Sequence, residues 1–330
     1  MFPTSAERAR FAYNPAKFIE RAVRDYVAHS PNNRYSIFPD EPIWEEPLVG
    51  FADGYDPLFQ QYKQIIGDFH VTPREALERY LRTGGLGERD LSSVSVISWI
   101  LPAAARTRQS MRKSAPICSR RWNYARFEGQ EFNFRLSRYL VVMLEGMGLI
   151  AVAPELTKWF EMVDLPGGKA SRWSQRHIAY AAGLGTFGLS DGFITARGIA
   201  IRAGSVVCNL ALPASPRPYA GFRSNCLFYS GAKCGKCIQR CPAGAISEKG
   251  HDKVKCFNCL IEMKEKARQA GLLPDYIGTD IIGCGFCQVG VPCESRIPLN
   301  KPAATSTVLR PCGAARFKVR RRNRARGPAP

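Results

Sequence analysis

The chain has 330 residues, of which 45% are hydrophobic, so it can bury a core and form more than one domain. Its formal net charge of +19 indicates an anionic partner, such as nucleic acid or a phosphorylated cofactor. No run of about 18 apolar residues occurs, and the first residues have no apolar h-region or twin arginine. We therefore expect no membrane span and a cytoplasmic location.

Cap signals mark two helices in the first 90 residues. Asn14 as N-cap and Pro15 at the first helical position open one helix, which ends before Pro31. Thr72 to Glu75 reads as a capping box, and the helix that it opens stops at Gly84-Gly85. Residues 31–58 are rich in proline, acids and aromatics and are predicted as an irregular arm.

Strands alternate with helices further along the chain. Ser93 to Leu101 is an apolar, β-branched run closed by Pro102, which predicts a buried strand. The other predicted elements are a helix at 131–147, a strand at 149–152, a helix at 173–182, and strands at 193–201 and 205–212. This alternation predicts a layered α/β or α+β domain.

A glycine-rich stretch follows the helix predicted at 173–182. Gly183, Gly185 and Gly188 match the pattern G-x-G-x-x-G. A dinucleotide-binding fingerprint must follow a strand and open a helix, and this stretch follows a helix. We therefore expect a loop whose backbone passes close to a bulky neighbour, either another part of the chain or a cofactor.

Nine of the twelve cysteines lie between Cys226 and Cys293. Their two- and three-residue spacings predict soft thiolate ligands for zinc or iron–sulfur. Cys241 directly precedes Pro242, as in bacterial two-cluster ferredoxins, where this cysteine binds the second cluster. The pattern lacks two standard cysteines, because Gly231 and Val291 stand in their places.

Two four-cysteine sets follow if Cys226 and Cys293 replace the missing ligands. One predicted set is Cys226, Cys234, Cys237 and Cys293, and the other is Cys241, Cys256, Cys284 and Cys287. Cys259 is then a spare or an alternate for Cys256. A second interpretation is a zinc ribbon, in which Cys234, Cys237, Cys256 and Cys259 hold one zinc ion.

Several segments together resemble the epoxyqueuosine reductases and their relatives, the corrinoid-dependent reductive dehalogenases. The resemblance rests on the strand from Val94 to Pro102, Tyr124 to Glu131, Ala182 to Asp191, Ile194-Thr195, Gly204 to Val207, and the cysteines. It implies a nitroreductase-like α/β domain that holds a cobalamin, followed by a ferredoxin-like module with two [4Fe–4S] clusters. The implied domains are an arm at 1–90, the cobalamin domain at 91–222, the module at 223–300 and a basic tail at 301–330.

The resemblance also implies site residues and partners. Glu131 takes the position of a proton donor, with Tyr124 as its alternative, and a protonated Glu131 requires a partly desolvated carboxyl. The implied cofactor-binding residues are Gly183, Gly185, Gly188, Ser190 and Asp191. The electron donor would be a reduced ferredoxin or flavodoxin.

The function expected from the sequence is thus an iron–sulfur reductase that passes electrons to a cobalamin. Two alternatives remain open, namely a ferredoxin-like electron carrier without corrinoid and a zinc-ribbon nucleic-acid-binding protein. The end of the chain has eight basic residues and no acid from Arg310 onward, which predicts either a nucleic-acid arm or a solvated, disordered tail.

Overall fold

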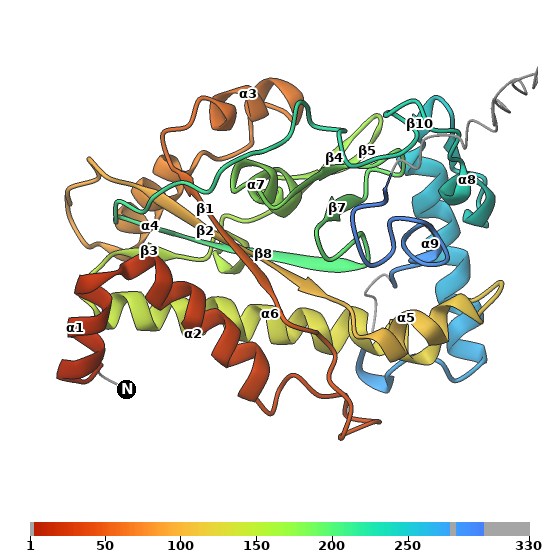
Figure 1. The fold of residues 1–330 in the computed structure, drawn as a ribbon, viewed down its shortest axis with the longest axis horizontal. Coiled ribbons are helices and arrows are strands. Elements are labelled where there is room, and N and C mark those ends of the chain that lie inside the picture. Colours follow the sequence, from red (N-terminus) through yellow and green to blue (C-terminus); the bar gives the residue numbers. More distant parts are fainter. Residues whose placement is uncertain (1–2, 278–281, 300–330) are drawn as a thin grey trace, which may run out of the picture. The chain divides into compact units, whose positions relative to one another are not determined.

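A four-stranded antiparallel sheet with the strand order β1-β2-β8-β3 organises the part of the chain that precedes the cysteines (Figure 1). The computed structural model describes residues 3–277 and 282–299. The strands of the sheet are β1 (Leu48–Asp53), β2 (Ser95–Pro102), β3 (Ala151–Val152) and β8 (Ile201–Cys208). Three further pairs are β4 (Met162–Leu165) with β5 (Gly168–Ser171), β6 (Gly185–Phe187) with β7 (Phe193–Thr195), and β9 (Ile246–Ser247) with β10 (Gly250–His251).

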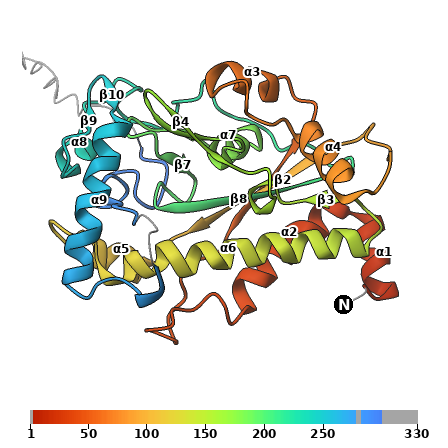
Figure 2. The ribbon, with the colours of Figure 1, turned by 180° about the vertical axis from the view of Figure 1, so that it is seen from behind.

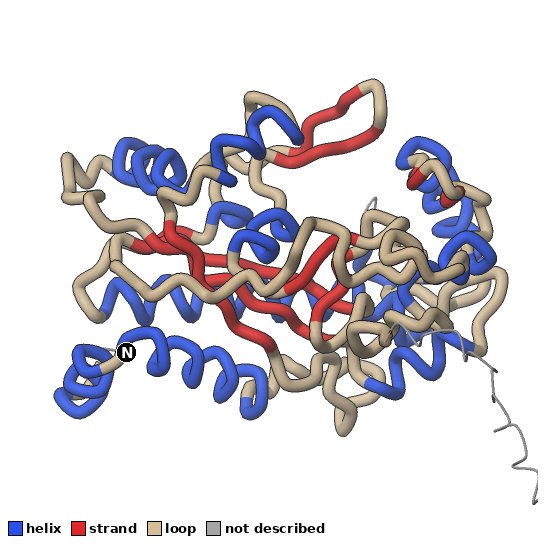
Figure 3. The backbone as a smooth tube through the Cα atoms, turned by 45° about the horizontal axis from the view of Figure 1, so that its top comes forward, coloured by secondary structure: helices blue, strands red, loops and turns tan. Residues whose placement is uncertain are grey.

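Helices cover both faces of the sheet (Figures 1 and 3). The helices are α1 (Ser5–Tyr13), α2 (Pro15–His29), α3 (Leu58–Ile65), α4 (Pro73–Gly84), α5 (Ala105–Arg112), α6 (Arg120–Gly146), α7 (Gln175–Ala181), α8 (Lys236–Arg240) and α9 (Lys253–Gln269). Short 3-10 turns occur at η1 (Pro154–Leu156), η2 (Asp275–Ile277) and η3 (Phe286–Gln288). The prediction of mixed helix and sheet is therefore confirmed.

The alternation of side chains along β2 explains the layers. Ile97, Trp99 and Leu101 pack into a core with residues of α2 and α6. Val96 and Ile100 belong to a second core with residues of α4 and α7. Successive side chains of a strand point to opposite faces, so β2 serves both cores. Each fully buried aliphatic side chain contributes about 1.5–3 kcal/mol.

The capped helices and the buried strand are where the sequence predicts them. Asn14 Oδ1 accepts from the backbone N–H of Lys17 at 2.9 Å, and α2 ends at His29. Thr72 and Glu75 form the reciprocal capping box of α4, whose C-cap Gly85 has φ +64°. All eight residues of β2 are buried.

Other element boundaries differ from the predictions. Helix α6 begins at Arg120, eleven residues before the predicted start at 131, because Ser119 Oγ caps it by accepting from Trp122 N–H at 3.2 Å. The strand predicted at 193–201 ends at Thr195, where a turn passes through Gly198 with φ +86°. The next strand is β8 instead of 205–212, since it pairs with β2 from Ile201 to Cys208.

Part of the predicted irregular arm is regular. Residues 48–53 form β1, which pairs with β2 at one edge of the sheet. Residues 58–65 form α3. Both segments lack strong local signals, so the pairing with β2 accounts for β1 better than its own sequence does.

The cysteine-bearing segment lies at one end of the sheet in both ribbon views, where α8 and α9 flank α5 (Figures 1 and 2). It packs through two small apolar clusters. One contains Met111, Met263, Ala267 and Phe286, and the other contains Ile194, Ile199, Ile246 and Val291. In the part of the chain that is described, no helix is both long and apolar enough to cross a membrane. The basic end at 301–330 lies outside the described residues.

Candidate functional site

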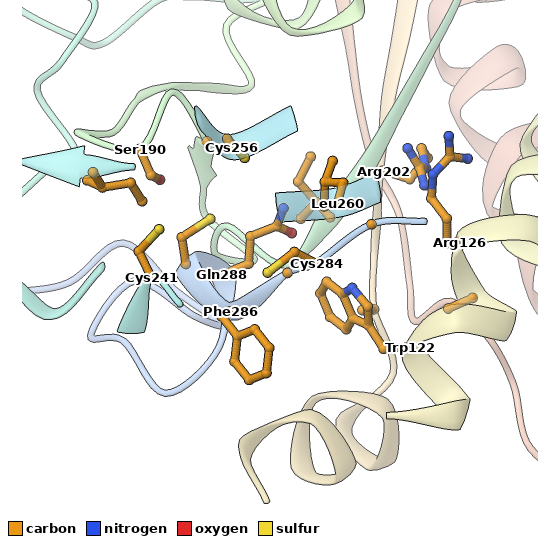
Figure 4. Close-up of a pocket in the computed structure, with 18 of the residues that line it drawn as sticks. Trp122, Arg126, Ser190, Arg202, Cys241, Cys256, Leu260, Cys284, Phe286 and Gln288 are labelled. Atoms are coloured by element: carbon orange, nitrogen blue, oxygen red, sulfur yellow. The ribbon is translucent and has the colours of Figure 1, made fainter. Parts of the chain in front are cut away.

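A cavity of about 290 Å³ lies between the cysteine-bearing segment and the sheet with its helix α6. Four cysteines line one end, and arginines and tryptophans line the other (Figure 4). We call it the cysteine–arginine cavity. Its lining residues are Trp44, Ala103, Trp122, Ala125, Arg126, Arg176, Ser190, Gly192, Ile201, Arg202, Cys241, Pro242, Ile246, His251, Cys256, Leu260 and 283–288.

The four cysteines of this cavity come from three local structures. Cys241 is the C-cap residue of α8, and its Sγ accepts from the N–H of Ala245 at 3.3 Å. Cys256 lies in the first turns of α9. Cys284 and Cys287 lie on either side of the start of η3. These four are the residues of one predicted ligand set.

The other predicted set lines a second, smaller cavity of about 30 Å³. Cys226, Cys234, Cys237 and Cys293 contribute to it. The carbonyl of Cys293 accepts from the N–H of Ile199 at 2.8 Å, which ties this cysteine to the sheet end. Cys287 lines both cavities, so the two groups of thiols are neighbours.

Electrostatic coupling follows the same grouping. Burial, then the nearby thiols of Cys226 and Cys234, raise the pKa of Cys237 to about 11. Burial, then the thiols of Cys226 and Cys237, raise the pKa of Cys293 to about 12. Burial and the thiol of Cys256 raise the pKa of Cys287 to about 12. Only the thiolate is a metal ligand, so a bound metal would displace the protons of these thiols.

Cys259 lies outside both linings. Burial, then the thiols of Cys256 and Cys241, raise its pKa, so it stays near the first group. Cys234 and Cys237 line the small cavity, whereas Cys256 lines the cysteine–arginine cavity. The structure thus divides the proposed zinc-ribbon cysteines between two places. Among residues 3–277 and 282–299, no group of three or more His, Cys, Asp or Glu side chains is arranged to hold a single metal ion.

The glycine-rich stretch is shaped by its own chain. It leads from α7 into β6, so it has the helix-then-strand order expected from the sequence. A Cβ at Gly183, which has φ +72°, would lie 2.3 Å from the carbonyl oxygen of Pro216. A Cβ at Gly185 would lie 2.4 Å from the carbonyl oxygen of Ile194. These two glycines are therefore required by backbone packing, whereas Gly188 lines the small cavity.

Ser190 and Asp191 lie where three cavities approach one another. Ser190 lines both cysteine cavities, and its hydroxyl hydrogen-bonds the Cys287 thiol. Asp191 has φ +55°, and its carboxylate lies 3.3 Å from His251 Nδ1. Its carbonyl accepts a hydrogen bond from the guanidinium of Arg176. Strained backbone of this kind at a non-glycine residue is a feature of functional sites.

Asp191 also lines a third cavity, of about 780 Å³, which we call the aromatic cavity. It lies among α3, α7 and the β4–β5 pair. Its size is within the range of small-molecule and cofactor pockets. Its aromatic lining residues are Tyr62, His177, Tyr180, Phe187 and Phe222, and its cationic ones are Lys169, Arg176, Arg223 and Lys253.

The structure does not bring Glu131 to these cavities. Glu131 lies on α6, its side chain is 48% exposed, and its Oε1 pairs with Arg135 at 3.1 Å and with Arg138 at 3.4 Å. The desolvated carboxyl that a protonated donor requires is absent at this position, because the side chain faces water and two arginines. Tyr124 is buried in the sheet core, and the ring lies 5.6 Å from the guanidinium of Arg120.

The sequence analysis missed the arginines of the cysteine–arginine cavity. Arg126 comes from α6, Arg202 from β8 and Arg176 from α7. A usable signal existed only for Arg202, which interrupts an otherwise apolar strand. A charged residue within a buried strand is an exception that points to a function or a partner.

No protein-family model matches the chain. It is similar to the epoxyqueuosine reductase of Bacillus cereus, with 28% identity over 254 residues that cover 69% of this chain and 60% of that protein. The epoxyqueuosine reductase of Francisella cf. novicida is 35% identical over 131 residues, which cover 38% of this chain and 33% of that protein. The matches thus span 60% or less of the length of these curated relatives.

Solved structures of epoxyqueuosine reductases are also similar at low identity. A Bacillus subtilis structure has a TM-score of 0.43 and 16% identity, covering 86% of this chain and 68% of that one. A structure with an epoxyqueuosine-modified tRNA-Tyr stem loop has a TM-score of 0.44 and 17% identity, covering 84% and 66% of the two chains.

Proposed function

Because the chain is a divergent relative of the epoxyqueuosine reductases, we propose that it is an oxidoreductase with two iron–sulfur clusters. The observation that carries this proposal is the division of eight cysteines into two groups of four, one at each of two adjacent cavities. Four cysteine thiolates are the usual donor set of a [4Fe–4S] cluster.

The donor chemistry of both groups suits such a cluster. Each group gathers thiols whose burial and mutual proximity raise their pKa values, as at Cys237 and Cys293. Those protons leave when thiolates bind a metal, so ligation removes the repulsion among the thiolates. When bound, the two clusters would supply one-electron transfer between a donor and the substrate site. Cys287, which lines both cavities, keeps the two groups adjacent.

We further propose that the aromatic cavity holds a corrinoid, as the resemblance implies. Its volume of about 780 Å³ and its flat aromatic lining suit a large planar group. Of the predicted cofactor-binding residues, Asp191 lines this cavity. Arg176 lines both the aromatic and the cysteine–arginine cavities, which makes it the residue between cofactor and cluster.

The substrate and partners follow from the names of the relatives and from charge. An epoxyqueuosine-containing RNA is the substrate that those names suggest, and a net charge of +19 favours binding to RNA. A reduced ferredoxin or flavodoxin would supply electrons. We place this chemistry in the cytoplasm, where thiols stay reduced.

Metal analysis after anaerobic purification tests the proposal. We expect about eight irons and eight sulfides per chain, with extractable corrinoid and no stoichiometric zinc. The Cys293→Ala variant should lose about half the iron, because it removes a ligand of only one set. Cys259→Ala and the fully buried Cys208→Ala serve as matched controls and should keep it all.

Each other result contradicts a stated part. One zinc per chain without iron would establish the zinc ribbon instead. Full iron without corrinoid would leave a ferredoxin-like electron carrier. Loss of half the iron in Cys259→Ala, but not in Cys256→Ala, would make Cys259 the ligand.

A further inference from the structure

We propose that the arginine end of the cysteine–arginine cavity binds an anionic group of the substrate, a carboxylate or a phosphate, between Arg126 and Arg202. The inference deepens the proposed function and rests on it for the statement that the ligand is the substrate. The binding of an anion at this place rests on the structure alone.

Two guanidinium groups converge at this end. Figure 4 shows Arg126 and Arg202 side by side, beyond Cys284 and next to Trp122. They come from α6 and β8, so the long helix and a central strand hold them in place. Like charges repel strongly where water is scarce, and an anion between them would remove that repulsion. Planar guanidinium forks also match the geometry of carboxylate and phosphate oxygens.

The acidic residue nearby does not balance this charge. Glu155 interacts electrostatically with both Arg126 and Arg202 and accepts a hydrogen bond from Gln175 at 3.0 Å. Burial raises its pKa, which favours its neutral form. Burial, then the neighbouring Arg126, lower the pKa of Arg202 to about 9, so Arg202 keeps its charge at neutral pH. The site is therefore cationic.

A donor remains available at the site. Arg202 Nε is buried and has no hydrogen-bond partner among the described residues. A buried donor without a partner costs about 1–3 kcal/mol, more for a charged group. An oxygen of a bound anion would satisfy it.

The remaining walls define the rest of the ligand. Trp44, Trp122, Ala103, Ala125 and Ile201 make this end apolar apart from the arginines. Trp44 spends its indole N–H on the carbonyl of Gly129 at 3.2 Å, so its ring offers only an apolar surface. We infer a small organic anion whose flat or apolar body lies against tryptophan. A cavity of about 290 Å³, part of which belongs to the cysteine end, limits that body to roughly one ring system.

A competing explanation assigns the arginines to the cluster itself. Four thiolates on a [4Fe–4S] core leave a net negative charge, which nearby guanidinium groups would offset. In that case the arginines would bind no added anion, so anion titration separates the two explanations.

Calorimetric titration of the purified, full-length protein is the test, with iron content measured on the same sample. The probes are inorganic phosphate, benzoate, and benzamide as a neutral analogue of benzoate. We expect benzoate or phosphate to bind and benzamide to bind at least about tenfold more weakly, a difference of about 1.4 kcal/mol. The proposal is overturned if neither anion binds at about 10 mM, or if benzamide binds as well as benzoate.

Matched variants locate the site. Arg126→Met and Arg202→Met should each weaken anion binding at least about tenfold. Arg135→Met is the control, because Arg135 lies exposed on the same helix and pairs with Glu131. An equal loss in Arg135→Met would overturn the assignment. Arg202→Lys keeps the charge if Arg202→Met fails to fold, and it should retain phosphate binding better than benzoate, since lysine cannot form the bidentate pair.

The two proposals fail separately. Full iron without anion binding refutes the anion site and leaves the reductase. Anion binding that depends on Arg126 and Arg202 in a protein without iron supports the site and refutes the reductase.

Discussion

The role of Glu131 is the prediction at the scale of single residues that the structure changes most. Its carboxylate is half exposed and lies within 3.4 Å of two arginines, and opposite charges nearby favour the ionised form. We expect Glu131→Gln to change turnover by less than about threefold, compared with the roughly 10²–10⁴-fold loss on removing a general acid. Steady-state turnover with a reduced electron donor measures this.

A loss of a hundredfold or more in Glu131→Gln, with iron and corrinoid retained, would contradict the placement and restore the proton-donor role. Tyr124→Phe is the companion variant, because Tyr124 is the alternative donor. The aromatic ring keeps its place in the core in that variant, so any loss of turnover would report on the hydroxyl.

Cysteines were predictable and arginines were not, for a physical reason. Ligands such as Cys234, Cys237 and Cys241 lie within a few residues of one another, so their spacing alone brings them together. Arg126 and Arg202 are 76 residues apart in the chain and meet only because α6 packs on the sheet that contains β8. No local rule predicts such a meeting.

At the scale of elements, the structure shows a clamp that holds the end of one cysteine set. Glu294, directly after Cys293, is buried and accepts from Arg112 Nε at 2.8 Å and from the N–H of Gly290 at 2.8 Å. Arg108 lies 3.5 Å away on the same helix, α5. The clamp therefore joins α5 to the segment that carries Cys293.

We expect Glu294→Gln to loosen this segment, because removing one partner of a buried ion pair costs about 3–5 kcal/mol. About half of the iron should then be lost to a chelator at least tenfold faster than from the unmodified protein, since Cys293 belongs to one set. The rate of iron release, followed by absorbance, measures this. Glu78→Gln breaks an exposed pair with Arg74 and should change nothing beyond about 0.5 kcal/mol. Equal rates in the two variants would contradict the clamp.

Local signals explain which elements the sequence predicts well. Helices α2 and α4 carry their own caps, and β2 carries an uninterrupted apolar run. Strand β8 includes Arg202 and Gly204, which interrupt the strand pattern. Gly204 is required because a Cβ there would lie 2.5 Å from the Trp99 ring, a contact that only the folded sheet creates.

At the scale of the whole molecule, the sheet and the cysteine-bearing segment depend on different sources of stability. The sheet is stabilised by two large apolar cores. Helix α8 has no buried residue, whereas the last turns of α9 bury Met263 and Ala267 against Met111 of α5. Metal ligation would therefore matter most for α8 and for the loop at 284–293.

Removal of the metals should consequently unfold the segment in two steps, and not as one unit. After anaerobic chelation, we expect α8 and residues 284–293 to lose at least about tenfold in amide protection, since opening of a few kcal/mol less than global unfolding is read directly by exchange. Residues 263–269 of α9 should keep more protection because their apolar contacts do not involve thiolates. The buried strands β2 and β8 should be unchanged and serve as the internal control. Hydrogen exchange with mass spectrometry resolves these regions. Uniform protection before and after chelation would show that the segment does not depend on its thiolates, and simultaneous loss in β2 would show that the whole chain unfolds with it.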